Sequence, residues 1–145
     1  ESPFLFAVGV FSVYLIIGGY LAIRYKKKDV DFLPDKILAI IMIITGAGMI
    51  GLPPILSNKI HIVLTVFGTA GIIFSINDLR AFKKPEKLRK KWLQAHLGKM
   101  IGGYISAVTA FVVVNAFFPP LIGWLGPSVI GTLFIIYWSR KVSPK

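Results

Sequence analysis

The sequence lacks cysteine altogether and is poor in acidic residues, with six Asp and Glu among 145 positions. Without cysteine the chain forms no disulfide, no thiolate nucleophile and no cysteine-ligated metal site. Charged residues make up only 16% of the chain, whereas soluble domains average about 25%. Hydrophobic residues make up 55%, and mean hydropathy is +0.74, more apolar surface than so small a soluble domain can bury. The composition therefore excludes a soluble globular enzyme and a disordered chain, and it indicates an integral membrane protein.

Long stretches of the chain also lack any Asp, Glu, Lys or Arg. A membrane-spanning helix needs roughly 20 mostly apolar residues, and three charge-free runs have about this length. A fourth run, Met100–Ser139, is twice as long and has Pro119-Pro120 at its middle, which divides it into two spans. We therefore predict an all-α integral membrane bundle of five transmembrane helices with a short basic interfacial helix. Residues 1–145 form a single transmembrane domain, with spans at about residues 4–23, 37–56, 60–77, 97–118 and 121–139.

The basic residues fall on one side of this arrangement. Sixteen of the 17 Lys and Arg residues lie in Arg24–Lys36, Asp78–Lys99 and Arg140–Lys145, with Lys59 left over. Basic residues in short loops mark the cytoplasmic face of a membrane protein. We expect a bacterial inner-membrane protein with its N-terminus outside and its C-terminus in the cytoplasm. The net charge of +11 then predicts contacts with anionic lipid headgroups, and we expect no nucleic-acid partner.

The most basic stretch is Arg80–Lys99, and it predicts the short amphipathic interfacial helix. Pro85 suits a first helical position, and Leu88, Trp92 and Ala95 follow at helical spacing. Two interpretations stay open, an ordinary positive-inside loop or a dedicated site for an anionic lipid or partner. The candidate contact residues are Lys87, Arg89, Lys90, Lys91 and Trp92.

Two glycine patterns occur inside predicted spans. Gly46-Ala-Gly48-Met-Ile-Gly51 matches the G-x-G-x-x-G dinucleotide fingerprint, but that motif needs a preceding strand and an acidic residue about 20 positions on. Here the run is uncharged and the next acidic residue is Asp78, so we interpret the motif as a close helix contact. In the fourth span, small residues recur every four positions and predict helix packing or a slot for a flat ligand or lipid. These are Gly98, Gly102, Ser106 and Ala110, widened by Gly103 and Ala107.

His96 is the residue most suited to a cofactor. Imidazole binds both metal and proton near pH 7, and the neighbouring glycines leave space beside it. Haem b is the group that this pattern would hold, with Lys99 near a propionate; the alternative is an interfacial histidine with backbone or water contacts. The candidate cofactor-binding residues are His96, Gly98, Lys99, Gly102 and Gly103. We predict no catalytic residues and no metal-ligating cluster, and His61 lies a bilayer away from His96.

Polar residues within the spans are few. Asn115, Asp78 and Arg80 are the candidate buried polar groups, and we expect Asp78 to pair with Arg80 or Lys99. No acidic or basic residue falls at the middle of a predicted span, which counts against a proton-coupled transporter.

Residues 85–115, PEKLRKKWLQAHLGKMIGGYISAVTAFVVVN, resemble a family of small bacterial multi-pass membrane proteins of unassigned function. The resemblance covers most of the chain, and its matching positions are His96, Gly98, Met100, Gly102, Gly103, Thr109, Asn115 and Trp124. It implies that about two further N-terminal helices precede this chain, where a partner for His96 would lie. It carries no activity over to this chain.

Three functions stay open at this point. The first is a non-enzymatic protein that binds a small molecule or lipid, or a subunit of a larger membrane complex. The second is a haem-b redox protein using His96. The third is a small transporter or channel that works as an oligomer.

Overall fold

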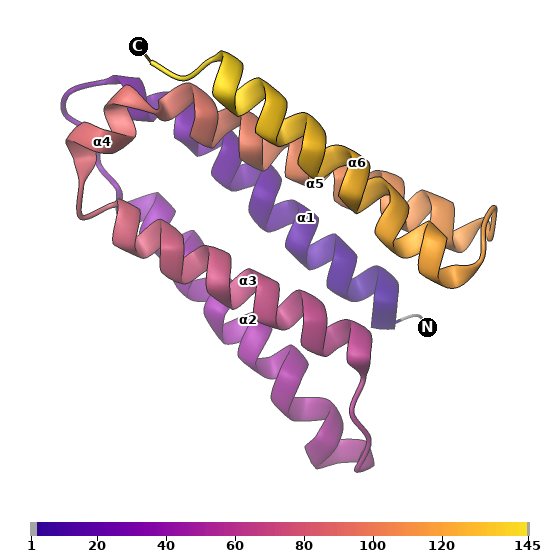
Figure 1. The fold of residues 1–145 in the computed structure, drawn as a ribbon. Coiled ribbons are helices and arrows are strands. Elements are labelled where there is room, and N and C mark those ends of the chain that lie inside the picture. The colour runs from indigo at the N-terminus through magenta and orange to yellow at the C-terminus, as the bar shows by residue number, and fades with distance from the viewer. Residues whose placement is uncertain (1–2, 145) are drawn as a thin grey trace.

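A computed structural model describes residues 3–144, and all the regular secondary structure in that range is helical (Figure 1). The helices are α1 (Pro3–Ala22), α2 (Leu33–Ser57), α3 (Ile62–Ala81), α4 (Pro85–Lys90), α5 (Trp92–Val114) and α6 (Pro120–Lys141). A 3₁₀ turn, η1 (Ile23–Lys26), follows α1. All but α4 and η1 are long and apolar enough to cross a membrane, which confirms the five predicted spanning helices.

Some helix ends differ from those of the predicted spans. α5 begins at Trp92 rather than at residue 97, and it ends at Val114 rather than at 118. A charge-free run marks the part of a helix that suits hydrocarbon, and the backbone continues to coil where polar side chains reach water. Pro53 and Pro54 likewise lie inside the last turns of α2, which ends at Ser57.

The expected interfacial helix is not evident as a separate amphipathic element. Helix α4 has only six residues, and Lys91 leaves helical geometry with φ −111° and ψ 20° before α5 begins. Leu88, Trp92 and Ala95 therefore belong to two helices. Their side chains pack on the cluster of Ala22, Tyr25 and Phe82 inside the protein. The turn at Lys91 redirects the chain into a spanning helix, which a continuous helix along the membrane surface would not allow.

Helix α1 lies at the centre of the bundle, between two helical hairpins (Figure 1). The α2–α3 hairpin packs on one side of α1, and the α5–α6 hairpin packs on the other through α5. Within residues 3–144, no backbone contact joins the two hairpins directly. The space between α3 and the α5–α6 hairpin is therefore bounded by α1.

Glycines set the closest helix contacts. A Cβ added at Gly46 would lie 2.8 Å from the carbonyl oxygen of Gly68, and one added at Gly68 would lie 2.8 Å from that of Gly46. The backbones of α2 and α3 touch there, which confirms the helix-contact interpretation of the glycine motif. At Gly103 of α5, an added Cβ would lie 2.9 Å from Ile16 of α1. Small residues thus bring the helices together, as is usual in membrane bundles.

Candidate functional site

A charged cluster joins α1, α3 and α5 inside the bundle. Lys99 Nζ donates to the Asp78 carboxylate at 2.6 Å, and the Tyr14 hydroxyl donates to the same carboxylate oxygen. The Asp78 and Lys99 side chains are only 21% and 16% exposed. The prediction that Asp78 pairs with Arg80 or Lys99 is confirmed for Lys99.

Glycines of α1 make room for this cluster. A Cβ added at Gly18 would lie 3.1 Å from Lys99 Nζ, and one added at Gly19 would lie 2.9 Å from Met100 Sδ. The lysine side chain therefore crosses the bare backbone of α1 to reach Asp78. Ser75, fully buried one turn before Asp78, has no hydrogen-bond partner for its hydroxyl among the described residues.

His96 lies beside the cluster and binds the same glycine backbone. Its Nδ1 is 2.7 Å from the carbonyl oxygen of Gly19, so the ring donates an N–H there. A carbonyl oxygen only accepts, which places a proton on Nδ1. His61 precedes α3 at the other end of that helix and is exposed, as expected.

The five candidate cofactor residues do not line one pocket. Lys99 is engaged by Asp78, and Gly103 packs against Ile16. Gly98 and Gly102 line a cavity between other helices instead. The structure therefore gives His96, Gly98, Lys99, Gly102 and Gly103 different neighbours, and a cofactor site at His96 stays a prediction. The residues share one helix, but that helix presents them to different neighbours.

The cavity beside Gly98 and Gly102 lies between the two hairpins, and we call it the α5 cavity. It has a volume of about 470 Å³ and is lined by α1, α3, α5 and α6. Its walls are mostly apolar, and Val66, Phe74 and Leu125 on those walls are exposed at the bundle surface. Ligand pockets in proteins have volumes of about 300–1,000 Å³. The α5 cavity is thus large enough for a small molecule that enters sideways from lipid.

Hydroxyl groups are the polar elements of the α5 cavity. Thr109, Ser128 and Thr132 donate to the carbonyl oxygens four residues earlier in their own helices. Ser106, which is only 7% exposed, also lines the cavity, and no partner for its hydroxyl exists in the part of the chain that the structure describes. The Ser106 hydroxyl is therefore left for a ligand.

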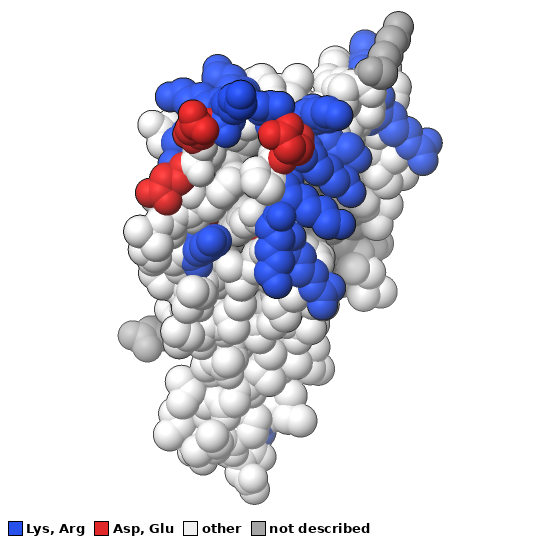
Figure 2. Space-filling view, turned by 90° about the vertical axis from the view of Figure 1, so that its left-hand side faces the viewer, with Lys and Arg blue, Asp and Glu red and all other residues white. Residues whose placement is uncertain are grey.

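Lys and Arg gather at the end of the bundle that carries α4, and the rest of the same face is almost free of charge (Figure 2). The five predicted contact residues differ in their surroundings there. Arg89 is paired with Glu86 at 2.6 Å, and the Trp92 ring lies 5.3 Å from Lys26 Nζ. Lys87 and Lys91 line a cavity of about 290 Å³ with Arg80 and Lys84, which we call the cationic cavity. Lys90 is exposed.

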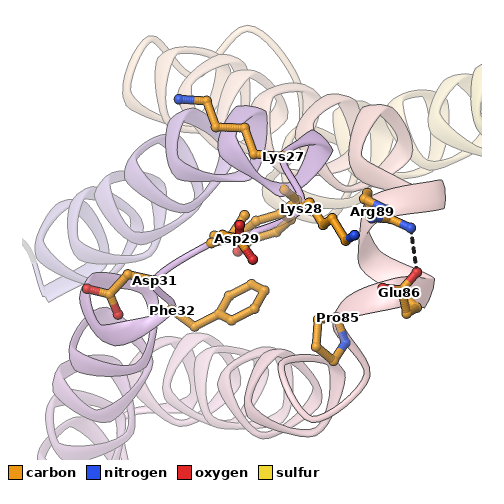
Figure 3. Close-up of a pocket in the computed structure, with 10 residues that line it drawn as sticks. Lys27, Lys28, Asp29, Asp31, Phe32, Pro85, Glu86 and Arg89 are labelled. Carbon is orange, nitrogen blue, oxygen red and sulfur yellow. Dashed lines mark hydrogen bonds and ion pairs between the residues drawn. The ribbon is translucent and has the colours of Figure 1, made fainter.

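A second cleft of about 550 Å³ lies at the same end, between the loop after η1 and α4 (Figure 3). Phe32 points into it, Arg89 points toward Glu86, and Lys27 and Asp31 point outward. Its lining carries equal numbers of basic and acidic residues, so its charges balance. This cleft has no preference for an anion or a cation.

The sequence interpretation missed a second buried ion pair. Asp35 is 3% exposed and accepts from Arg24 Nη2 at 2.5 Å and from the Tyr25 hydroxyl at 2.7 Å. It lies in the first turn of α2, where the helix dipole favours a carboxylate. The position of Asp35 at the start of a predicted span, close in sequence to a basic segment, could have indicated this ion pair.

Two of the three residues expected to be buried polar groups are not buried. Asn115 ends α5 and is exposed, with its side-chain amide donating to Phe111 at 2.8 Å. Arg80 is exposed in the last turn of α3, while Asp78 is partly buried. Asn115 satisfies its amide on its own helix, so it needs no partner from another span.

Comparisons of the chain with protein-family models, with curated proteins and with solved structures find no match. The site must therefore be interpreted from its own geometry.

Proposed function

We propose that this chain is a non-enzymatic membrane protein that holds a lipid-like small molecule in the α5 cavity. The observation that carries this is Ser106, a residue only 7% exposed on the wall of an apolar cavity, whose hydroxyl has no hydrogen-bond partner among residues 3–144. A hydroxyl that faces an apolar cavity without a partner is unfavourable, so a ligand with a hydrogen-bonding group would be stabilised there.

The surroundings of the cavity define the chemistry of its occupant. The walls within the spanning helices are apolar, and hydroxyls are their only hydrogen-bonding side chains apart from the Trp124 indole. A charged molecule would find no counter-ion in the cavity. The ligand is therefore a neutral, mostly hydrocarbon molecule with one polar group.

Gly98 offers a direct test, because an added Cβ there meets no atom within 4 Å and the residue lines the cavity. Gly98→Phe should fill the cavity without disturbing the helix contacts. Mass spectrometry of lipophilic molecules retained by the purified protein should show a bound molecule in the parent and its loss in this variant. Gly51→Phe is the matched control, because Gly51 has equally open space and lines none of the cavities described above.

Ser106→Ala provides a second variant that keeps the cavity open and removes only the hydroxyl. It should retain less of the same molecule, and its thermal stability without ligand should be equal to or higher than that of the parent. A parent protein that retains no lipophilic molecule, or a Gly98→Phe variant that retains as much as the parent, contradicts the proposal.

Haem b bound through His96 is a second candidate, and one observation favours it. The hydrogen bond from Nδ1 to the Gly19 carbonyl fixes the ring and leaves Nε2 as the ligating nitrogen, an arrangement typical of ligating histidines. His61, the second histidine of the chain, lies at the far end of α3 and cannot supply the other axial ligand within one molecule. Absorbance at the haem Soret band in the purified protein, lost in His96→Ala, would establish this candidate.

We also propose that the protein lies in a bacterial inner membrane with its basic end in the cytoplasm. Sixteen of the 17 basic residues lie in the three segments assigned to that end, and anionic lipids of the inner leaflet would attract them. The resemblance to small bacterial multi-pass proteins agrees with this location. A homo-oligomer or a larger complex would cover part of the apolar surface in place of lipid.

A further inference from the structure

The cationic cavity differs from the rest of the basic end in having no acidic residue in its lining. It is formed by the last turn of α3, by α4 and by the residues next to them. Its volume is about 290 Å³. Its lining consists of Arg80, Ala81, Lys84, Lys87, Leu88 and Lys91. Four positive side chains, all exposed, therefore line one small depression at the surface.

The acidic residues nearest in sequence are engaged elsewhere. Asp78 is bound by Lys99 and Tyr14, and Glu86 is bound by Arg89. Among the described residues, no ion pair involves any of the four cations of the cavity. The C-terminal end of α3 contributes only about half a negative charge, which four cations outweigh. The cavity thus lacks a counter-ion.

We propose that the cationic cavity binds a phosphate group, which several Lys and Arg side chains surround through charge-assisted hydrogen bonds. Leu88 and Ala81 give the cavity an apolar wall beside those charges. The cavity also adjoins the end of a spanning helix, where lipid headgroups lie. These features suit the phosphate of an anionic lipid, and a free phosphate ion shares the same chemistry.

This site is independent of the α5 cavity, with which it shares no residue. It is also more specific than general attraction of a basic surface to anionic lipid. General attraction depends on the number of charges, whereas a site depends on which lysines line it. The chain provides a comparison within one segment, because Lys83 and Lys90 are exposed and line neither the cationic cavity nor the neighbouring cleft.

The test compares two double variants with the same change in net charge. Lys84→Gln/Lys87→Gln removes two cations from the cavity, and Lys83→Gln/Lys90→Gln removes two beside it. Binding of short-chain phosphatidylglycerol to the detergent-solubilised full chain is measured by native mass spectrometry. The affinity should fall at least about tenfold for the first variant, because two charge-assisted contacts with the phosphate are lost. It should fall less than about threefold for the second.

Inorganic phosphate, titrated as a competitor, identifies the source of the group. Displacement of phosphatidylglycerol by millimolar phosphate indicates that the phosphate alone is recognised, and no displacement indicates that the lipid as a whole is recognised. Circular dichroism confirms that both variants are folded. Equal losses of affinity in the two double variants, or no loss in either, would overturn the proposal.

Discussion

At the scale of single residues, Asp78 is a carboxylate held inside the bundle by side chains of two other helices. Its carboxylate is mostly enclosed between spanning helices and accepts from Lys99 and Tyr14 together. A charge inside a spanning segment is costly unless it is paired. The pair also provides a direct polar link between the α2–α3 hairpin and α5, whose backbones do not touch within the described range. The Asp78–Lys99 ion pair therefore links the α2–α3 hairpin to the α5–α6 hairpin.

Removing one partner of the Asp78–Lys99 ion pair should destabilise the protein strongly. Lys99→Met leaves Asp78 without its cation, and loss of one partner from a buried pair costs about 3 kcal/mol. Thermal unfolding in detergent should show a clearly lower Tm. Asp78→Leu added to Lys99→Met should recover part of the loss, because no unpaired charge then remains.

The exposed pair on α4 is the matched control. Arg89→Met breaks the contact with Glu86, whose side chain is 72% exposed, and should cost less than about 1 kcal/mol. Equal Tm shifts for Lys99→Met and Arg89→Met would show that the Asp78–Lys99 pair stabilises the bundle no more than an exposed ion pair does.

At the scale of elements, α2 and α3 make a close backbone contact at Gly46 and Gly68. Gly46 and Gly68 face each other so closely that a Cβ on either would meet the carbonyl oxygen of the other. A carbonyl in a helix cannot move aside as a flexible side chain can. Helix packing in lipid rests on such close approach, because lipid tails are as apolar as the helices themselves.

Gly46→Ala should therefore separate α2 from α3 and lower stability by about 1–3 kcal/mol. Gly48→Ala is the control, since its Cβ would meet only Leu52 at an ordinary distance of 3.7 Å. That variant should be neutral or more stable by up to about 1 kcal/mol, because alanine favours a helix. The thermal unfolding midpoints of the two variants and the parent are measured in one detergent. A Gly46→Ala protein as stable as the parent would contradict a close contact between Gly46 and Gly68.

Sequence reasoning captured features that depend on composition and spacing. The charge-free runs and Pro119-Pro120 predicted the five spans, and the proximity of Asp78 to an excess of cations predicted its pairing with Lys99. The division of His96, Lys99 and Gly102 among different neighbours depends on how α5 is rotated against α1. Helical spacing shows which residues share a face but not which helix that face meets. The α5 cavity and the cationic cavity arise between elements, and no single segment encodes them.

At the scale of the whole molecule, two hairpins flank α1 and charge gathers at one end (Figures 1 and 2). The α5 cavity lies among spanning helices, and the cationic cavity lies at the basic end. A lipid-like ligand in the first and a phosphate in the second both require that the five helices cross a membrane. They also require that the basic segments share one side of it.

The most direct measurement is therefore labelling of single cysteines from outside intact cells with a membrane-impermeant maleimide. The chain has no cysteine, so each introduced thiol is the only one present. Lys84→Cys and Ser143→Cys should be protected until the membrane is opened, whereas Ser57→Cys and Phe118→Cys should react at once. Labelling of Lys84→Cys in sealed cells, or protection of Ser57→Cys, would contradict the five-span arrangement with a cytoplasmic basic end.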